Sequence, residues 1–184
     1  SAIAIALGLL IAYVGGAFTG GSKGIADIPV LTGVGILGGA MFRDFAIVAT
    51  AFGADLDSIY KAGWVGAMSV ILGVVISFIV GVVVAVLFGY KDAVSISTIG
   101  AGAATYIVGP VTGTALGAQS DVIALSVAAG LVKSVLVMIG TPFVAKSVGL
   151  DNPLSAMIYG GLMGTTSGVA GGLAATDPKL VPYG

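Results

Sequence analysis

The stretch GWVGAMSVILGVVISFIVGVVVAVLF, residues 63–88, contains no charged side chain and decides the fold class. A helix needs about 20 consecutive apolar residues to cross the hydrocarbon core of a bilayer, and this run is long enough. The rest of the chain agrees, because 58% of its 184 residues are hydrophobic, only 8% are charged and the mean hydropathy is +1.16. Soluble domains carry about 25% charged residues. We therefore expect an all-α, polytopic membrane protein.

Five further apolar runs lie on either side of this segment. Together they predict one transmembrane domain over residues 1–184 with about six membrane segments, at 2–18, 29–53, 63–88, 93–116, 122–146 and 153–176. The loops between these segments are short and carry most of the charged side chains.

The composition excludes several classes of function. The chain has no histidine and no cysteine, and all eight of its acidic residues are aspartates. Imidazole and thiol chemistry are therefore impossible, and no phosphate-binding loop is present. The net charge of −1 does not indicate a nucleic-acid partner. We expect no enzymatic activity and no cofactor.

An internal repeat is indicated by two similar hexapeptides. ILGGAM at residues 36–41 matches IYGGLM at residues 158–163, 122 positions later. In this alignment the charged pair Arg43 and Asp44 lies opposite the polar run Thr165, Thr166 and Ser167. Hydrophobic segments interrupted at matching positions of a repeat indicate a transporter binding site near the bilayer midplane. We therefore predict two broken transmembrane helices, interrupted at residues 42–45 and 164–168, whose breaks meet close to residues 105–114.

The repeat also bears on topology. It places the first segment opposite the fifth but leaves the third and fourth without partners, so we expect the natural chain to be longer at both ends. If every segment crosses once, the two copies point the same way. An inverted repeat requires residues 93–118 to re-enter the membrane or to cross it twice, and Gly100, Gly102 and Gly109-Pro110 permit this.

Three cationic or acidic side chains within the apolar segments are candidate site residues. Charges at this depth are costly and mark functional sites. Arg43 has the planar donor fork that binds a carboxylate, and Asp44 would bind a coupling cation or neutralise Arg43. In the alternative, Arg43 snorkels to the interface. Lys133 lies about 16 Å from the nearer helix end, so it must meet an acid, a substrate or a cavity.

Polar residues at the helix breaks complete the predicted site. Thr165, Thr166 and Ser167 precede a half-helix whose free amides would bind an anion. Thr105, Thr112 and Thr114 flank Gly109-Pro110, and hydroxyl and carbonyl oxygens are ligands that a hard cation prefers. In the alternative, these threonines bond to their own helix backbone.

Three motifs give the chain a specific resemblance. At SISTIGAGAATYIVGPVTGTALGAQSDVIALS (residues 95–126), GGAMFRDFAIVATAF (38–52) and GLAATDPKLVPYG (172–184), it resembles the large M subunit of the bacterial malonate:sodium symporter. It is more distantly similar to holin-like large subunits and to plastid glycolate/glycerate carriers.

The resemblance implies a subunit of a secondary transporter that imports malonate with sodium as the coupling ion. It also implies a smaller membrane subunit as partner and a multi-pass location in the bacterial cytoplasmic membrane. Two alternatives stay open at this point. One is a carrier of another small carboxylate such as glycolate or pyruvate, and the other is a holin-like or structural membrane subunit without transport activity.

Overall fold

The computed structural model describes residues 2–20, 28–29, 41, 45, 48–49 and 51–184. The chain forms two compact units, Ser1–Gly53 and Ala54–Gly184. In the first unit, helix α1 spans Ala2–Thr19, close to the predicted segment 2–18. The large side chains of Leu10, Tyr13 and Phe18 on this helix are exposed, which suits a lipid-facing surface.

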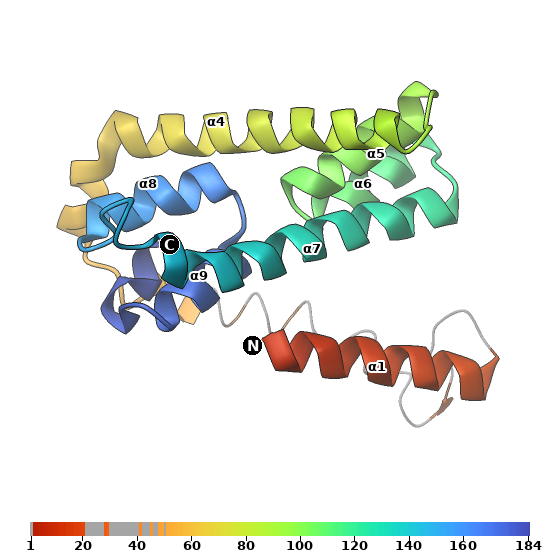
Figure 1. Ribbon diagram of the computed structural model, residues 1–184, viewed down its shortest axis with the longest axis horizontal. Coiled ribbons are helices and arrows are strands. Elements are labelled where there is room, and N and C mark those ends of the chain that lie inside the picture. Colours follow the sequence, from red (N-terminus) through yellow and green to blue (C-terminus); the bar gives the residue numbers. More distant parts are fainter. Residues whose placement is uncertain (1, 21–27, 30–40, 42–44, 46–47, 50) are drawn as a thin grey trace. The chain divides into compact units, whose positions relative to one another are not determined.

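The second unit consists entirely of helices (Figure 1). In chain order they are α4 (Leu56–Leu87), α5 (Ala93–Ala104), α6 (Val108–Leu116), α7 (Ser120–Val144), α8 (Pro153–Met163), α9 (Thr166–Ala174) and the 3₁₀ helix η3 (Pro178–Tyr183). Every regular element of the described residues is therefore a helix, which confirms the all-α part of the predicted fold class.

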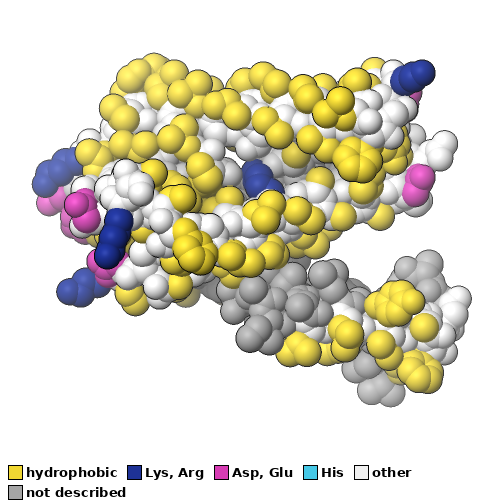
Figure 2. Space-filling view, viewed as in Figure 1, with side chains coloured by type: hydrophobic (Ala, Val, Ile, Leu, Met, Phe, Trp, Pro, Cys, Tyr) yellow, Lys and Arg dark blue, Asp and Glu magenta, His cyan; other side chains and the backbone are white. Residues whose placement is uncertain are grey.

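Two of the described helices, α4 and α7, are long and apolar enough to cross a membrane. Only 17% of the most apolar window of α4 and 28% of that of α7 are buried inside the protein, so neither is the buried core helix of a soluble domain. Figure 2 shows apolar side chains covering both long helices and charged side chains gathered mainly at the ends of the unit. Gly63, with φ of +43°, bends α4 where the predicted segment 63–88 begins.

The predicted single segment 93–116 is instead two short helices. Helix α5 ends at Ala104, Thr105 has an extended backbone, and α6 begins at Val108. The two helices pack against each other, and with 12 and 9 residues they extend only about 18 and 14 Å. A hydrocarbon core of about 30 Å is too thick for either to cross, so α5 and α6 form a helical hairpin.

Helices α8 and α9 form a second hairpin of the same kind. Helix α8 ends in Gly164, which has the left-handed backbone (φ +58°), and α9 begins at Thr166. The predicted interruption at residues 164–168 is therefore present in the structure at residues 164–165. In Figure 1 the two hairpins start at opposite ends of the second unit, and both lie against the long helices.

A repeat relates α4, α5 and α6 to α7, α8 and α9. Small residues on one face of each long helix match at a spacing of 57 positions: Ser69, Gly73 and Ser77 recur as Ser126, Gly130 and Ser134. The hairpins match at a spacing of 60: Asp92 and Asn152 each cap their helix by accepting a hydrogen bond from a serine amide three residues later. Helices α4 and α7 run in opposite directions (Figure 1), so the two copies are inverted.

Small residues let the hairpin backbones approach the long helices closely. A Cβ on Gly73 would collide with the backbone of Gly161 in α8, and a Cβ on Gly102 in α5 would collide with the backbone of Ser126 in α7. Each long helix therefore packs against the hairpin of the other copy as well as its own. This interlocking brings the tips of both hairpins to the middle of the unit.

Candidate functional site

Lys133 occupies the point where the two hairpin tips meet. It lies near the middle of α7, and its Nζ donates hydrogen bonds to the carbonyl oxygens of Ala104 at 2.6 Å and Gly164 at 3.1 Å. A third bond, at 3.3 Å, goes to the hydroxyl of Ser77 on α4. One ammonium group thus joins α4, α7 and both hairpins. The two carbonyl oxygens lie within about 6 Å of each other, the sum of the two bond lengths.

Both carbonyls belong to helix C-termini. Ala104 is the last residue of α5, and Gly164 is the C-cap of α8. The last carbonyls of a helix have no partner within it and carry the negative end of the helix dipole. Residues 104 and 164 are also equivalent positions of the 60-residue repeat. The ammonium is therefore held by matching groups of both copies, a role that suits a cation.

No carboxylate of the described residues forms an ion pair with Lys133. Its three hydrogen-bond partners are neutral oxygens. An acid was one of the partners expected for this lysine, and Asp44 is the acid that the sequence places within an apolar segment. Asp44 lies outside the described residues. Figure 2 shows basic atoms in the middle of this face, away from the charged groups at the ends.

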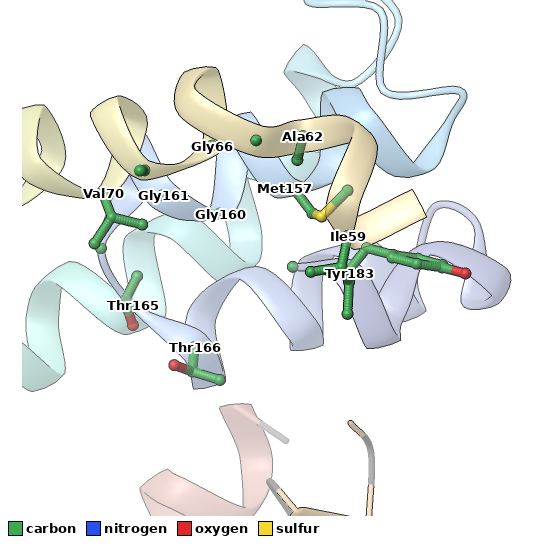
Figure 3. Close-up of a pocket in the computed structure, with 14 residues that line it drawn as sticks. Ile59, Ala62, Gly66, Val70, Met157, Gly160, Gly161, Thr165, Thr166 and Tyr183 are labelled. Atoms are coloured by element: carbon green, nitrogen blue, oxygen red, sulfur yellow. The ribbon is translucent and has the colours of Figure 1, made fainter. Parts of the chain in front are cut away.

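A cavity of about 450 Å³ lies beside the α8–α9 tip. One wall is the first half of α4, and the other is α8, the tip and the C-terminal residues (Figure 3). Gly164, Thr165 and Thr166 line it, whereas Ser167 and Lys133 are not among the lining residues. The ammonium is nevertheless adjacent, because a Cβ on Gly164 would lie 3.6 Å from Lys133 Nζ. The cavity and the lysine ammonium are therefore both adjacent to Gly164.

Thr165 holds the tip of this hairpin in place. Its hydroxyl is 2.6 Å from the hydroxyl of Ser134 on α7, and it accepts a hydrogen bond from the amide of Gly168, which caps α9. Thr165 is buried, while Thr166 and Ser167 are exposed. The first amides of α9 have no partner within the helix, so this end of the cavity offers donors to an anion.

The three threonines predicted to bind a cation are not gathered at one point. Thr105 lies at the tip of the α5–α6 hairpin, and Thr112 and Thr114 lie along α6. Thr114 is about 9 Å along the helix axis from its first residue, and positions 112 and 114 point to different sides of the helix. Thr114 is exposed. The structure therefore brings only the Thr105 end of this group close to Lys133.

Arg43 and Asp44 lie outside the described residues, as does the predicted break at residues 42–45. The sequence interpretation missed Ser77, Ser134 and the carbonyl of Ala104. The shared pattern S-V-x-x-G-x-V-x-S at residues 69–77 and 126–134 was the available signal for the two serines. Lys133 in the second copy of this pattern corresponds to Ile76 in the first, so the two copies differ in charge at this position.

Comparison with known proteins gives one finding. A family model described as the malonate/sodium symporter MadM subunit matches residues 1–184. No curated protein and no solved structure matches the chain.

Proposed function

The chain belongs to the malonate/sodium symporter MadM subunit family, and we propose that Ala54–Gly184 contains part of its substrate pathway, centred on Lys133. The protein is thus a subunit of a membrane transporter and not an enzyme. The observation that supports this location is the bonding of one lysine to matching carbonyls of two inverted hairpins.

The architecture supports a transport role for this point. Many secondary transporters combine inverted repeats with interrupted helices, and they bind substrate and ion near the midplane where the repeats meet. Here α4 and α7 would span the bilayer, and the hairpins would enter from opposite sides to meet at Lys133. Irregular backbone at such depth is tolerated where protein or a watery cavity surrounds it. Gly164 and Thr165 meet this condition, because both line the cavity.

We place malonate in the cavity beside the α8–α9 tip. One carboxylate would accept hydrogen bonds from the first amides of α9 and from the Thr166 hydroxyl, where the helix dipole favours an anion. The other carboxylate would pair with the Lys133 ammonium once Nζ exchanges its bond to Gly164 for the substrate. A dicarboxylate uses both positive ends, whereas glycolate or pyruvate would use only one.

The sequence indicates further site residues, a coupling ion and a partner subunit. Arg43 would hold a carboxylate through its guanidinium fork, and Asp44 would balance it or bind sodium. We propose import of malonate driven by inward sodium movement across the bacterial cytoplasmic membrane, together with a smaller membrane subunit. Sodium offsets part of the substrate's charge and ties malonate uptake to the ion gradient.

Uptake of labelled malonate into vesicles tests this proposal. Vesicles containing the two-subunit symporter are compared with vesicles lacking the small subunit, each with and without a sodium gradient. Charge-assisted hydrogen bonds contribute about 1.5–3 kcal/mol each, so Lys133→Gln should raise the apparent KM for malonate about tenfold or more. Lys146→Gln removes the same charge from an exposed lysine and is the matched control. Normal uptake by Lys133→Gln at normal membrane levels would refute the role of Lys133.

A further inference from the structure

Three oxygens surround the Lys133 ammonium, and together they have the composition of a sodium site. They are the carbonyl oxygens of Ala104 and Gly164 and the hydroxyl oxygen of Ser77. We propose that these oxygens are ligands of the coupling sodium ion, and that sodium and the Lys133 ammonium compete for them. The inference rests on the proposed function, since it assigns the ion site at the location where we place the substrate pathway.

The chemistry of the three ligands favours a monovalent hard cation. Hard cations take carbonyl and hydroxyl oxygens as ligands, and these three oxygens carry no formal charge. A neutral ligand set suits a singly charged ion better than a divalent one, whose sites use carboxylates. Within the described part of the chain, no three acidic side chains cluster in a way that would hold a metal ion.

The backbone directs two helix dipoles at this point. Ala104 ends α5 and Gly164 caps α8, so the negative ends of both helices converge on Nζ. Interrupted helices in transporters bind coupling ions through such C-terminal carbonyls. The oxygens come from α4, α5 and the α8 tip, so an ion bound here would hold both hairpin tips together. Closure of the tips would thereby depend on a cation.

Only one of the two copies supplies a tethered cation. The position of α4 that corresponds to Lys133, 57 residues earlier, is occupied by Ile76. The carbonyls at 104 and 164 are equivalent, yet a single ammonium serves both. The two carbonyls thus follow the repeat, whereas the lysine does not. This difference is expected if the carbonyls also bind a cation other than the lysine ammonium.

Competition between the two cations would couple sodium to malonate. Like charges cannot share one set of ligands at this distance, so an arriving sodium ion must displace Nζ. The lysine stem has rotatable bonds, and Gly164, which lies beside Nζ and lines the cavity, has no side chain to obstruct its movement. The displaced ammonium would then face the malonate site. Sodium would thus strengthen malonate binding, and malonate would strengthen sodium binding by the same factor.

Sodium binding to the purified two-subunit symporter tests the inference. Radioactive sodium binding is measured without malonate in the wild type, Lys133→Gln and the exposed-site control Lys146→Gln. If Nζ occupies the three oxygens most of the time, the apparent affinity for sodium is lower, in proportion to the fraction of protein in which these oxygens are free. Lys133→Gln should therefore bind sodium about tenfold or more tightly, and Lys146→Gln should match the wild type. Unchanged or weaker sodium binding by a folded Lys133→Gln would overturn the competition.

A second variant tests the ligands without removing the lysine. Ser77→Ala deletes one oxygen from the site, and its bond to Nζ is the longest of the three. Sodium loses more than the ammonium does, so Ser77→Ala should raise the sodium concentration for half-maximal binding several-fold. Ser69→Ala, two turns earlier on the same helix, is the matched control, because Ser69 donates within its own helix to Gly66. Equal sodium binding by the two serine variants would remove Ser77 from the site and overturn the inference.

Malonate binding measured on the same samples separates the two proposals. Tight sodium binding by Lys133→Gln with intact malonate binding would contradict the proposed substrate role and support the ion site. Loss of malonate binding without tighter sodium binding would support the substrate role and overturn the ion competition.

Discussion

Gly130→Ala should loosen the contact that positions Lys133. A Cβ on Gly130 would lie 2.5 Å from the carbonyl oxygen of Gly102 and 2.6 Å from the Cα of Tyr106. Both atoms belong to the backbone of the opposite hairpin, so α5 must move away from α7 by close to 1 Å to restore an ordinary contact. Overpacking of this kind costs about 1–3 kcal/mol.

The control lies on the same helix. Gly140 has no atom within 4 Å of its ideal Cβ, so Gly140→Ala keeps the helix-propensity gain of about 1 kcal/mol without a collision. Both variants share that gain, and the difference between their unfolding free energies should therefore be the overpacking term of about 1–3 kcal/mol. Gly130 is one turn from Lys133, so the shift of α5 should also lengthen the 2.6 Å bond to Ala104.

Thermal unfolding of the purified symporter in detergent measures the first effect, and sodium-driven malonate uptake measures the second. Gly130→Ala should melt at a lower temperature than Gly140→Ala and transport more slowly. If the two variants melt together and transport equally well, the close packing of α5 on α7 is not what positions the lysine.

Two further predictions concern the hydroxyl pair at the α8–α9 tip and the helix caps. Ser134→Ala should destabilise the protein by about 1–3 kcal/mol because the buried Thr165 hydroxyl loses its 2.6 Å partner. The double variant with Thr165→Val should lose less stability than the sum of the losses in the two single variants. Additive losses of stability would refute a coupled pair. The hydroxyl and amide of Ser58 lower the pKa of Asp55, and the amide and hydroxyl of Ser95 lower that of Asp92, from the ordinary 3.8. Stability from these caps is therefore present above about pH 4 and falls as the pH drops through the folded pKa values. Replacing both aspartates by asparagine keeps the caps, so melting temperatures below pH 4 should fall less steeply than in the wild type.

Hydrophobic runs and interruptions were enough to predict much of the fold. The run at residues 63–88 and the straight part of α4 nearly coincide, and the polar residues after Gly164 marked the break between α8 and α9. The tip at Thr105 was harder to recognise. Residues 93–116 contain no charge, so length and hydropathy describe one helix, although the glycines permitted a re-entrant turn.

The site was less predictable for a physical reason. Lys133 stood out because a charge in an apolar segment is costly. Its partners at Ala104 and Gly164 are backbone carbonyls, which every residue has, so no residue type marks them. The threonines near Gly109-Pro110 were chosen for their side-chain oxygens, whereas the oxygens that converge are mainly those of helix ends.

A structure of the complete symporter with malonate and sodium bound gives the most direct test of the two proposed sites. We expect a malonate carboxylate within hydrogen-bond distance of Lys133 Nζ, beside the first turn of α9. We also expect an ion bound by the carbonyls of Ala104 and Gly164. A structure in which Nζ keeps both carbonyls while malonate and sodium bind elsewhere would contradict both proposals.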